Sequence, residues 1–193
     1  MALWGITDAD ESKPKWLSDA KKKEVFANNS GWVVEAGSTM TGNDNTDAQP
    51  EVLCCVGDLA TGIGAADITE IEFITTAFDK SDGGNIDVRV RFNEQVTVNT
   101  SGGTPTLTIT NDTPSRNLTA TYLSGSTTNE LIFRKTIAAA NAATNAGDVL
   151  SIAANAMALA SGTIKDTADG STNATITNSG AIGTAAGTIT VAA

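Results

Sequence analysis

The stretch IDVRVRFNEQVTVNTSGGTPTLTIT runs from residue 86 to residue 110, and its first half alternates strictly between apolar and charged side chains. Apolar residues occupy every second position up to the phenylalanine, and Asp87, Arg89 and Arg91 lie between them. A period of two is typical of a β-strand with one buried face and one wet face. We therefore expect a strand here with the two arginines in solvent. A second short strand, VTV, then a glycine-rich turn and the strand TLTIT should follow.

Composition limits the classes of protein to which this chain of 193 residues can belong. Its length suits one ordinary domain with a smaller attachment. Only 5% of the residues are aromatic, so we expect a thin core of Val, Ile, Leu and a few Phe. Twelve basic and 22 acidic side chains give a net charge of −10. This charge argues against nucleic acid as a partner, because phosphate binding needs a basic face.

Histidine is absent from the sequence. Its absence excludes Ser-His-Asp and Cys-His catalysis, His-ligated zinc and the commonest general base at neutral pH. We therefore expect neither an enzyme nor a cofactor, although a carboxylate pair or an all-oxygen cation site stays open. The two cysteines, Cys54 and Cys55, are neighbours, and a disulfide between neighbours is strained. We interpret them as reduced, partly buried thiols; the alternative is a redox switch.

Hydropathy gives an expectation for the cellular location. No apolar run approaches the length of a membrane span. The start of the chain lacks the cationic and apolar segments of a secretory signal. We expect a chain that is made in the cytoplasm and has no membrane partner.

Residues 1–63 form the first predicted unit. The segment LSDAKKKEVFAN predicts a short helix with Ser18 as its N-cap and with Val25 and Phe26 facing inward. GWVVEAG and PEVLCCVGDL predict two strands joined by a polar loop, with Trp32 packed inside the small sheet. Two strands and a short helix cannot bury enough surface to stand alone. We therefore expect this unit to pack on something else.

Residues 64–178 form the second predicted unit, which reads as seven short strands. The strands are ITEIEFITT, NIDVRVRF, TLTIT, NLTATYL, ELIFRKTI, DVLSIAA and NATITN, separated by Gly-, Asp- and Ser-rich turns. This spacing predicts an all-β antiparallel sandwich. We interpret IAAANAATNAG as a strand end and a loop, because its alanines show no apolar stripe. Residues 179–193 form an extension that ends in a candidate edge strand, TITVA.

The second unit resembles a bacterial and phage immunoglobulin-like repeat domain. The similarity is carried by VRVRFNEQVTV, GTPTLTIT, LTATYLSGSTTNELIFRKTI and GDVLSIAANAMALASGTIKDTADGSTN, in that order. It implies an immunoglobulin-like sandwich over roughly residues 67–178. In that family the domain serves as a spacer or contact module, in tandem in cell-surface adhesins and singly or in pairs on phage virions.

The first unit carries a second, shorter resemblance. MALWG, SKPKWLSDAKKKEVFA, GWVVEAG and EVLCCVGDL look like the N-terminal module of small virion proteins from marine and cyanobacterial tailed phages. The adjacent cysteines depart from the small apolar residues that usually continue the second strand of that module. The resemblance implies a structural protein that is attached to a virion.

The remaining motifs do not match known phosphate-binding or metal-binding patterns. GDLATGIGA lacks the Gly-Lys-Ser/Thr of a phosphate-binding loop and is expected to be a turn. Asp79 and Asp82, and likewise Asp166 and Asp169, lie in loops that lack the spacing of a calcium site, so turn capping is the favoured role. Glu94 is interpreted as structural, capping a bulge or turn between two strands. We therefore expect no metal site.

Two hypotheses for function follow from the resemblances. The first is a capsid decoration or cement protein, whose residues 1–63 bind the major capsid protein or other virion proteins on the outer surface of a phage head. Self-association on the particle is compatible with this hypothesis. The alternative is an immunoglobulin-like module of a tail, neck or fibre that contacts the host surface or glycans.

The candidate contact residues for the first hypothesis lie in the N-terminal arm. Trp4 and Trp16 are expected to act as buried anchors in the partner, because aromatic side chains dominate interface hot spots. Lys21, Lys22 and Lys23 are expected to add charge at the periphery, either as a solvated helix face or against an acidic surface.

Overall fold

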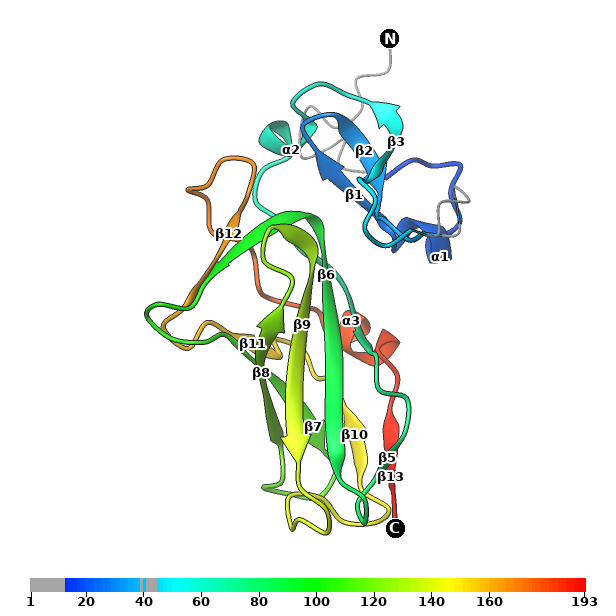
Figure 1. Cartoon of the computed structure of the whole chain (residues 1–193), viewed down its shortest axis with the longest axis vertical. Helices are drawn as coiled ribbons and strands as arrows, with labels where there is room; N and C mark the ends of the chain where they lie inside the picture. Colours follow the sequence, from blue (N-terminus) through cyan, green and yellow to red (C-terminus); the bar gives the residue numbers. More distant parts are fainter. Residues whose placement is uncertain (1–12, 39, 41–44) are drawn as a thin grey trace.

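The structure is a computed structural model, which describes residues 13–38, 40 and 45–193. Residues 1–12, and with them Trp4, lie outside the described residues. The described chain is built mostly of strands and has three short helices. A small N-terminal module, formed by the described part of residues 13–63, lies at one end of the molecule in Figure 1. The main body, residues 64–193, extends away from it and ends at the opposite tip.

The N-terminal module is a small antiparallel sheet flanked by two one-turn helices. Its elements are α1 (Asp19–Lys22), β1 (Val25–Asn28), β2 (Gly31–Val34), β3 (Glu51–Cys55) and α2 (Leu59–Gly62). Strand β2 pairs with β1 on one side and with β3 on the other. Trp32 is fully buried between these elements, as predicted, and packs with the apolar side chains of Val25, Leu59 and Ile63.

The predicted helix of the N-terminal module begins correctly but ends early. The Ser18 hydroxyl accepts a hydrogen bond from the backbone nitrogen of Lys21, which confirms the predicted N-cap. The helix stops at Lys22, so the prediction that Val25 and Phe26 are helical is wrong. Both lie in β1, which pairs with β2, and both are buried there. β-Branched and aromatic side chains favour strands over helices when a partner strand is present. The predicted turn GDLATGIGA contains α2, a single helical turn.

The main body contains the remaining elements. They are β4 (Ile68–Phe73), β5 (Phe78–Asp79), β6 (Gly84–Asn99), β7 (Thr106–Asn111), β8 (Leu118–Ser124), β9 (Thr128–Ile137), β10 (Val149–Ser151), β11 (Met157–Ala158), β12 (Thr163–Asp166), α3 (Gly180–Ala185) and β13 (Ile189–Ala192). Two strands predicted separately, NIDVRVRF and VTV, are one bent strand, β6. The predicted strand over residues 173–178 is wrong, since only isolated bridges at Asn173 and Thr175 occur there. The predicted loop after β9 and the predicted C-terminal strand, β13, are both present. The expected edge position of β13 is wrong, because β13 pairs with β10 on one side and with β5 on the other.

All the strands are connected through hydrogen-bonded neighbours into one mixed sheet. The order along the sheet is β3-β2-β1-β6-β9-β8-β7-β10-β13-β5, with β4 and β12 on β6 and with β11 on β7. The all-β fold class is therefore confirmed. The pairing links the strands into a single sheet that is not divided into two, so the immunoglobulin-like assignment stays a prediction.

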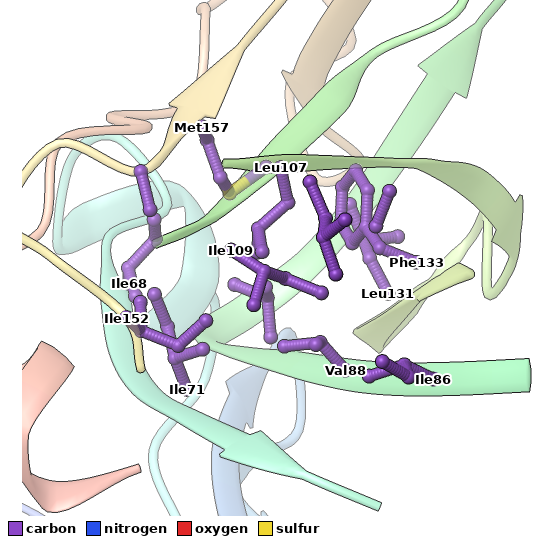
Figure 2. Close-up of a cluster of buried hydrophobic side chains, with 14 of the residues drawn as sticks. Ile68, Ile71, Ile86, Val88, Leu107, Ile109, Leu131, Phe133, Ile152 and Met157 are labelled. Atoms are coloured by element: carbon purple, nitrogen blue, oxygen red, sulfur yellow. The ribbon is translucent and has the colours of Figure 1, made fainter. Parts of the chain in front are cut away.

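The core of the main body lies between strands that are far apart in sequence. Figure 2 shows Ile86 and Val88 of β6 beside side chains from the neighbouring strands and the loop after β10. These neighbours include Ile68, Ile71, Leu107, Ile109, Leu131, Phe133, Ile152 and Met157. The alternating apolar residues of β6, through Phe92, are fully buried, which confirms the buried face predicted for this strand.

Candidate functional site

Strand β6 bends where the N-terminal module joins the main body. Its pairing with β9 is regular as far as Arg91 and resumes only at Val96, so residues 92–95 form a bulge. Ala27 of β1 pairs in parallel with Glu94 inside this bulge. Bulges redirect a strand and its side chains. The bulge is thus the point at which the small sheet continues into the large one (Figure 1).

The buried guanidinium group of Arg91 lies next to this bulge and binds carboxylates from both parts of the chain. Its Nη2 lies 3.0 Å from Glu35 Oε1, in the N-terminal module. Its Nη1 lies 2.8 Å from Glu70 Oε2 on β4, and its Nε lies 2.6 Å from Glu130 Oε1 on β9. A longer contact of 3.4 Å joins Nη1 to Glu72. The side chain of Arg91 is only 7% exposed, so these contacts replace its hydration shell.

Two further cations complete a charged cluster that we call the junction network. Arg89 binds Glu72 and Glu130, and Lys23 of the N-terminal module binds Glu70. The members of the junction network are Lys23, Glu35, Glu70, Glu72, Arg89, Arg91 and Glu130. Within it, four carboxyl groups face three cations.

Glu35 is the carboxyl group of the network whose protonation is most affected. Burial, and next to it the carboxylate of Glu130, together raise the pKa of Glu35 to about 7, against the opposing charge of Arg91. The Nδ2 of Asn129 donates a hydrogen bond to Glu35 Oε2 at 3.5 Å. Glu35 and Glu130 therefore face each other across the boundary between the two parts as a pair of like charges.

The pKa values of three other groups at the junction are also set by the balance between burial and neighbouring charges. Burial alone would raise the pKa of Glu70, but its bonds to Lys23 and Arg91 outweigh burial and lower that pKa. Burial likewise opposes the charge of Arg91, but Glu130 and Glu35 outweigh it and raise the pKa of the guanidinium. Burial lowers the pKa of Lys13 to about 8, against the attraction of Glu70.

A cavity of about 560 Å³ opens beside the junction network, between the two parts of the chain. Glu24, Glu35 and Ser38 line it from the N-terminal module, and Arg89 and Glu130 line it from the main body. The Ser38 hydroxyl donates a hydrogen bond to the carboxylate of Glu24. Water and protons can therefore reach the carboxyl group of Glu35 from this side.

A second pair of acids lies on the other side of the bulge. Glu94 is fully buried and lines a cavity of about 280 Å³ with Asn28 and Thr167. Its carboxyl group is a hydrogen-bond partner of Asp166, whose pKa is raised by burial against the opposing bond from the backbone of Ala168. Glu94 lies in a bulge, as predicted, but this bulge is inside the single strand β6 and not between two strands. Its pairing with Asp166 was not predicted.

The described contact residues among those predicted, Trp16, Lys21, Lys22 and Lys23, lie in or beside α1 of the N-terminal module. Trp16 is 64% exposed, and Leu17 beside it packs on the small core around Trp32. Lys21 is exposed at the end of α1. Trp16 and Lys21 are therefore both exposed at the surface of this module.

The other two lysines already bind acids within the chain. Lys22 Nζ lies 3.1 Å from Asp19 Oδ1, and Lys23 is bound to Glu70 of the main body. Lys23 thus helps to hold the two parts together, a role that its place in the sequence did not indicate.

The structure also shows the state of the two cysteines and the contacts of the loop aspartates. Cys54 is half-buried and Cys55 is exposed, and both are free thiols. Asp79, Asp166 and Asp169 each accept a backbone N–H two residues ahead, at 2.6–2.7 Å, which confirms turn capping at these three positions. Within the described residues, no group of three or more acidic or cysteine side chains is arranged to hold a metal ion.

The junction network was not predicted, because the alternating pattern of β6 predicts that Arg91 lies on the solvent-exposed face of the strand. That prediction is wrong: the N-terminal module covers this end of the face and buries the guanidinium. A signal was present in the matched charges of neighbouring strands. Glu70 pairs with Arg91 and Glu72 with Arg89 between β4 and β6, and opposite charges across strands stabilise a sheet.

No family model, curated protein or solved structure matches this chain. Among the described residues, no helix is long and apolar enough to cross a membrane.

Proposed function

We propose that this chain is a structural protein of a tailed-phage virion, a decoration or cement protein that binds the outer surface of the head through its N-terminal module. The partner in this proposal is the major capsid protein or a neighbouring virion protein. The protein acts by binding, without a cofactor.

The observation that carries the proposal is the exposure of Trp16. A tryptophan that is 64% exposed leaves a large apolar surface in water, and burying such a side chain in a partner is a common source of binding energy. The junction network fixes the module that presents Trp16 to the main body. While it is docked in this way, the module loses little conformational freedom when it binds a partner, which favours affinity.

The shape of the molecule is consistent with a particle-bound role. The N-terminal module occupies one end of the molecule, and the C-terminus lies at the other end (Figure 1). If the first end binds a shell, the main body projects outward or reaches a neighbouring copy. The net charge of −10 keeps such a projecting body soluble.

Glycan binding, the alternative role on a tail or fibre, finds less support in the main body. Tyr122 is its single tyrosine, and the ring is half-buried against Phe133, with 6.1 Å between the ring centres and an angle of 72° between the rings. Its hydroxyl also accepts a hydrogen bond from the backbone of Ser126. A ring held in this way does not offer a free face to a sugar.

The proposal is tested in two steps. Particles are first treated with a chaotrope, to determine whether the protein is released from heads or from tails. The protein and its variants are then added back to the stripped particles, and their binding is measured. Trp16→Ala should leave the stability of the free protein nearly intact and weaken binding by at least ~2 kcal/mol, as for an interface hot spot. Trp4→Ala tests the other predicted anchor in the same way. Lys21→Ser should have a smaller effect, visible mainly at low salt.

Leu123→Ala is the matched control, since Leu123 is 48% exposed but lies on β8 of the main body. It should bind like the unmodified protein. Normal binding of both Trp variants, together with loss of binding when the main body is deleted, would reject the N-terminal module as the anchor. Release with tails would favour the alternative role.

A further inference from the structure

Glu35 and Glu130 are two carboxyl groups that approach each other from opposite sides of the boundary between the N-terminal module and the main body. Glu35 follows β2, and Glu130 lies in β9. Both bind the single guanidinium of Arg91, at 3.0 and 2.6 Å. Like charges held this close cannot both ionise without cost, so one proton tends to stay with the pair.

The count of charges around the pair leads to the same conclusion. The junction network holds four carboxyl groups and three cations, with Arg91 and Arg89 on β6 and Lys23 before β1, and Lys13 adds a fourth cation beside it. Glu70 keeps its charge, because Lys23 and Arg91 lower its pKa. Glu24, across the adjoining cavity, adds a further negative charge on the side of the N-terminal module.

We propose that the Glu35–Glu130 pair is a proton-operated latch: docking of the N-terminal module on the main body takes up a proton, and the docked arrangement loosens as the pH rises toward neutrality. The adjoining cavity of about 560 Å³ gives this proton access to solvent. The proposal concerns the free protein and does not depend on a role in a virion.

The direction of the effect follows from the two states of Glu35. The docked carboxyl group holds its proton up to about pH 7, whereas the same group in solvent releases it near pH 4.5. Between these values the docked state binds more protons, so docking is strongest at the acid end. The docking equilibrium constant should fall by up to about tenfold for each pH unit across this window.

Lys13 acts at higher pH and in the opposite direction. Its burial lowers its pKa to about 8, so the docked state gives up a proton between this value and 10.5. Docking should therefore strengthen again above about pH 8. Because the two groups titrate in different ranges, measurements between pH 5 and pH 7.5 report mainly on Glu35.

The test uses the full chain and two measurements over this range. Carbon NMR of the side-chain carboxyl groups should show Glu35 titrating near pH 7. Hydrogen exchange of the amides of β1 should become faster as the pH rises, after correction for the intrinsic rate of exchange. Titration of Glu35 near its ordinary value of 4.5 would overturn the proposal.

Two variants at the pair separate the latch from a merely structural contact. Glu35→Gln imitates the protonated carboxyl group and should abolish the pH dependence of β1 exchange while keeping the module docked at pH 8. Glu130→Gln removes the opposing charge and should move the titration of Glu35 to lower pH. If β1 exchange kept its full pH dependence in Glu35→Gln, the latch would be rejected.

Asp166→Asn is the matched control. Asp166 also has a raised pKa and lies close to the bulge, but it belongs to the other acid pair. The titration of Glu35 near pH 7 should persist in this variant. A loss of that titration would place the proton at the Glu94–Asp166 pair and overturn the assignment to Glu35.

Discussion

The N-terminal module and the main body are both built from strands, but different forces hold them. The main body encloses a long apolar core, to which β4, β6, β7 and β9 all contribute. The N-terminal module has a small cluster around Trp32 and joins the main body through buried ions and one bridge between strands. A unit of this size gains too little from its own core, so its stability depends on the partner on which it packs.

The largest effect should come from the core of the main body. Phe92 is fully buried and lies opposite Ile68 on β4. Phe92→Ala should lower the free energy of unfolding by roughly 3–5 kcal/mol, as large-to-small changes in cores do. Denaturant unfolding of the full chain measures this loss. A loss below about 1 kcal/mol would contradict the core position of this residue.

A loss of similar or slightly smaller size should follow removal of the central cation of the junction. Arg91→Ala leaves Glu35, Glu70 and Glu130 without their shared partner, and breaking a buried ion pair on one side costs about 3–5 kcal/mol. Denaturant unfolding at neutral pH measures this cost. Arg134→Ala, which breaks a more exposed pair with Asp87, is the control and should cost much less.

Deletion of residues 1–63 should have a moderate effect on the part that remains. Residues 64–193 are expected to be soluble and monomeric and to melt in one cooperative transition, because the apolar core lies within them. The melting temperature should be lower than in the full chain, since Arg91 loses Glu35 and the bulge is uncovered. Arg91→Ala should also cost less in this shortened chain than in the full one, because coupled residues are not additive. An aggregated or molten product would reject the boundary between the two parts.

Removal of divalent ions should have the smallest effect. The loop aspartates Asp79, Asp166 and Asp169 cap their own turns. Chelator should leave the melting temperature of the full chain unchanged in a scanning calorimeter. A fall of several degrees would instead make these residues, together with Asp82, candidate cation ligands.

The sequence by itself determined the local features of this protein. The alternation from Ile86 to Phe92 predicted which side of β6 is buried, and Ser18 marked the start of α1. These features depend on neighbours in sequence, through the period of a strand and the unsatisfied amides of a helix end. The loop after β9 and the burial of Trp32 could be predicted for similar reasons.

Only the tertiary structure decided which part of the polar face of β6 is buried. Alternation predicts that Arg89 and Arg91 share one side of β6, but it does not say what covers that side. The N-terminal module covers the end at Arg91 and brings Glu35, distant in sequence, to its guanidinium. Val25 and Phe26 likewise became strand residues because β2 was present to pair with them. Burial of a charge depends on long-range packing, and for this reason the candidate site could not be predicted from local pattern.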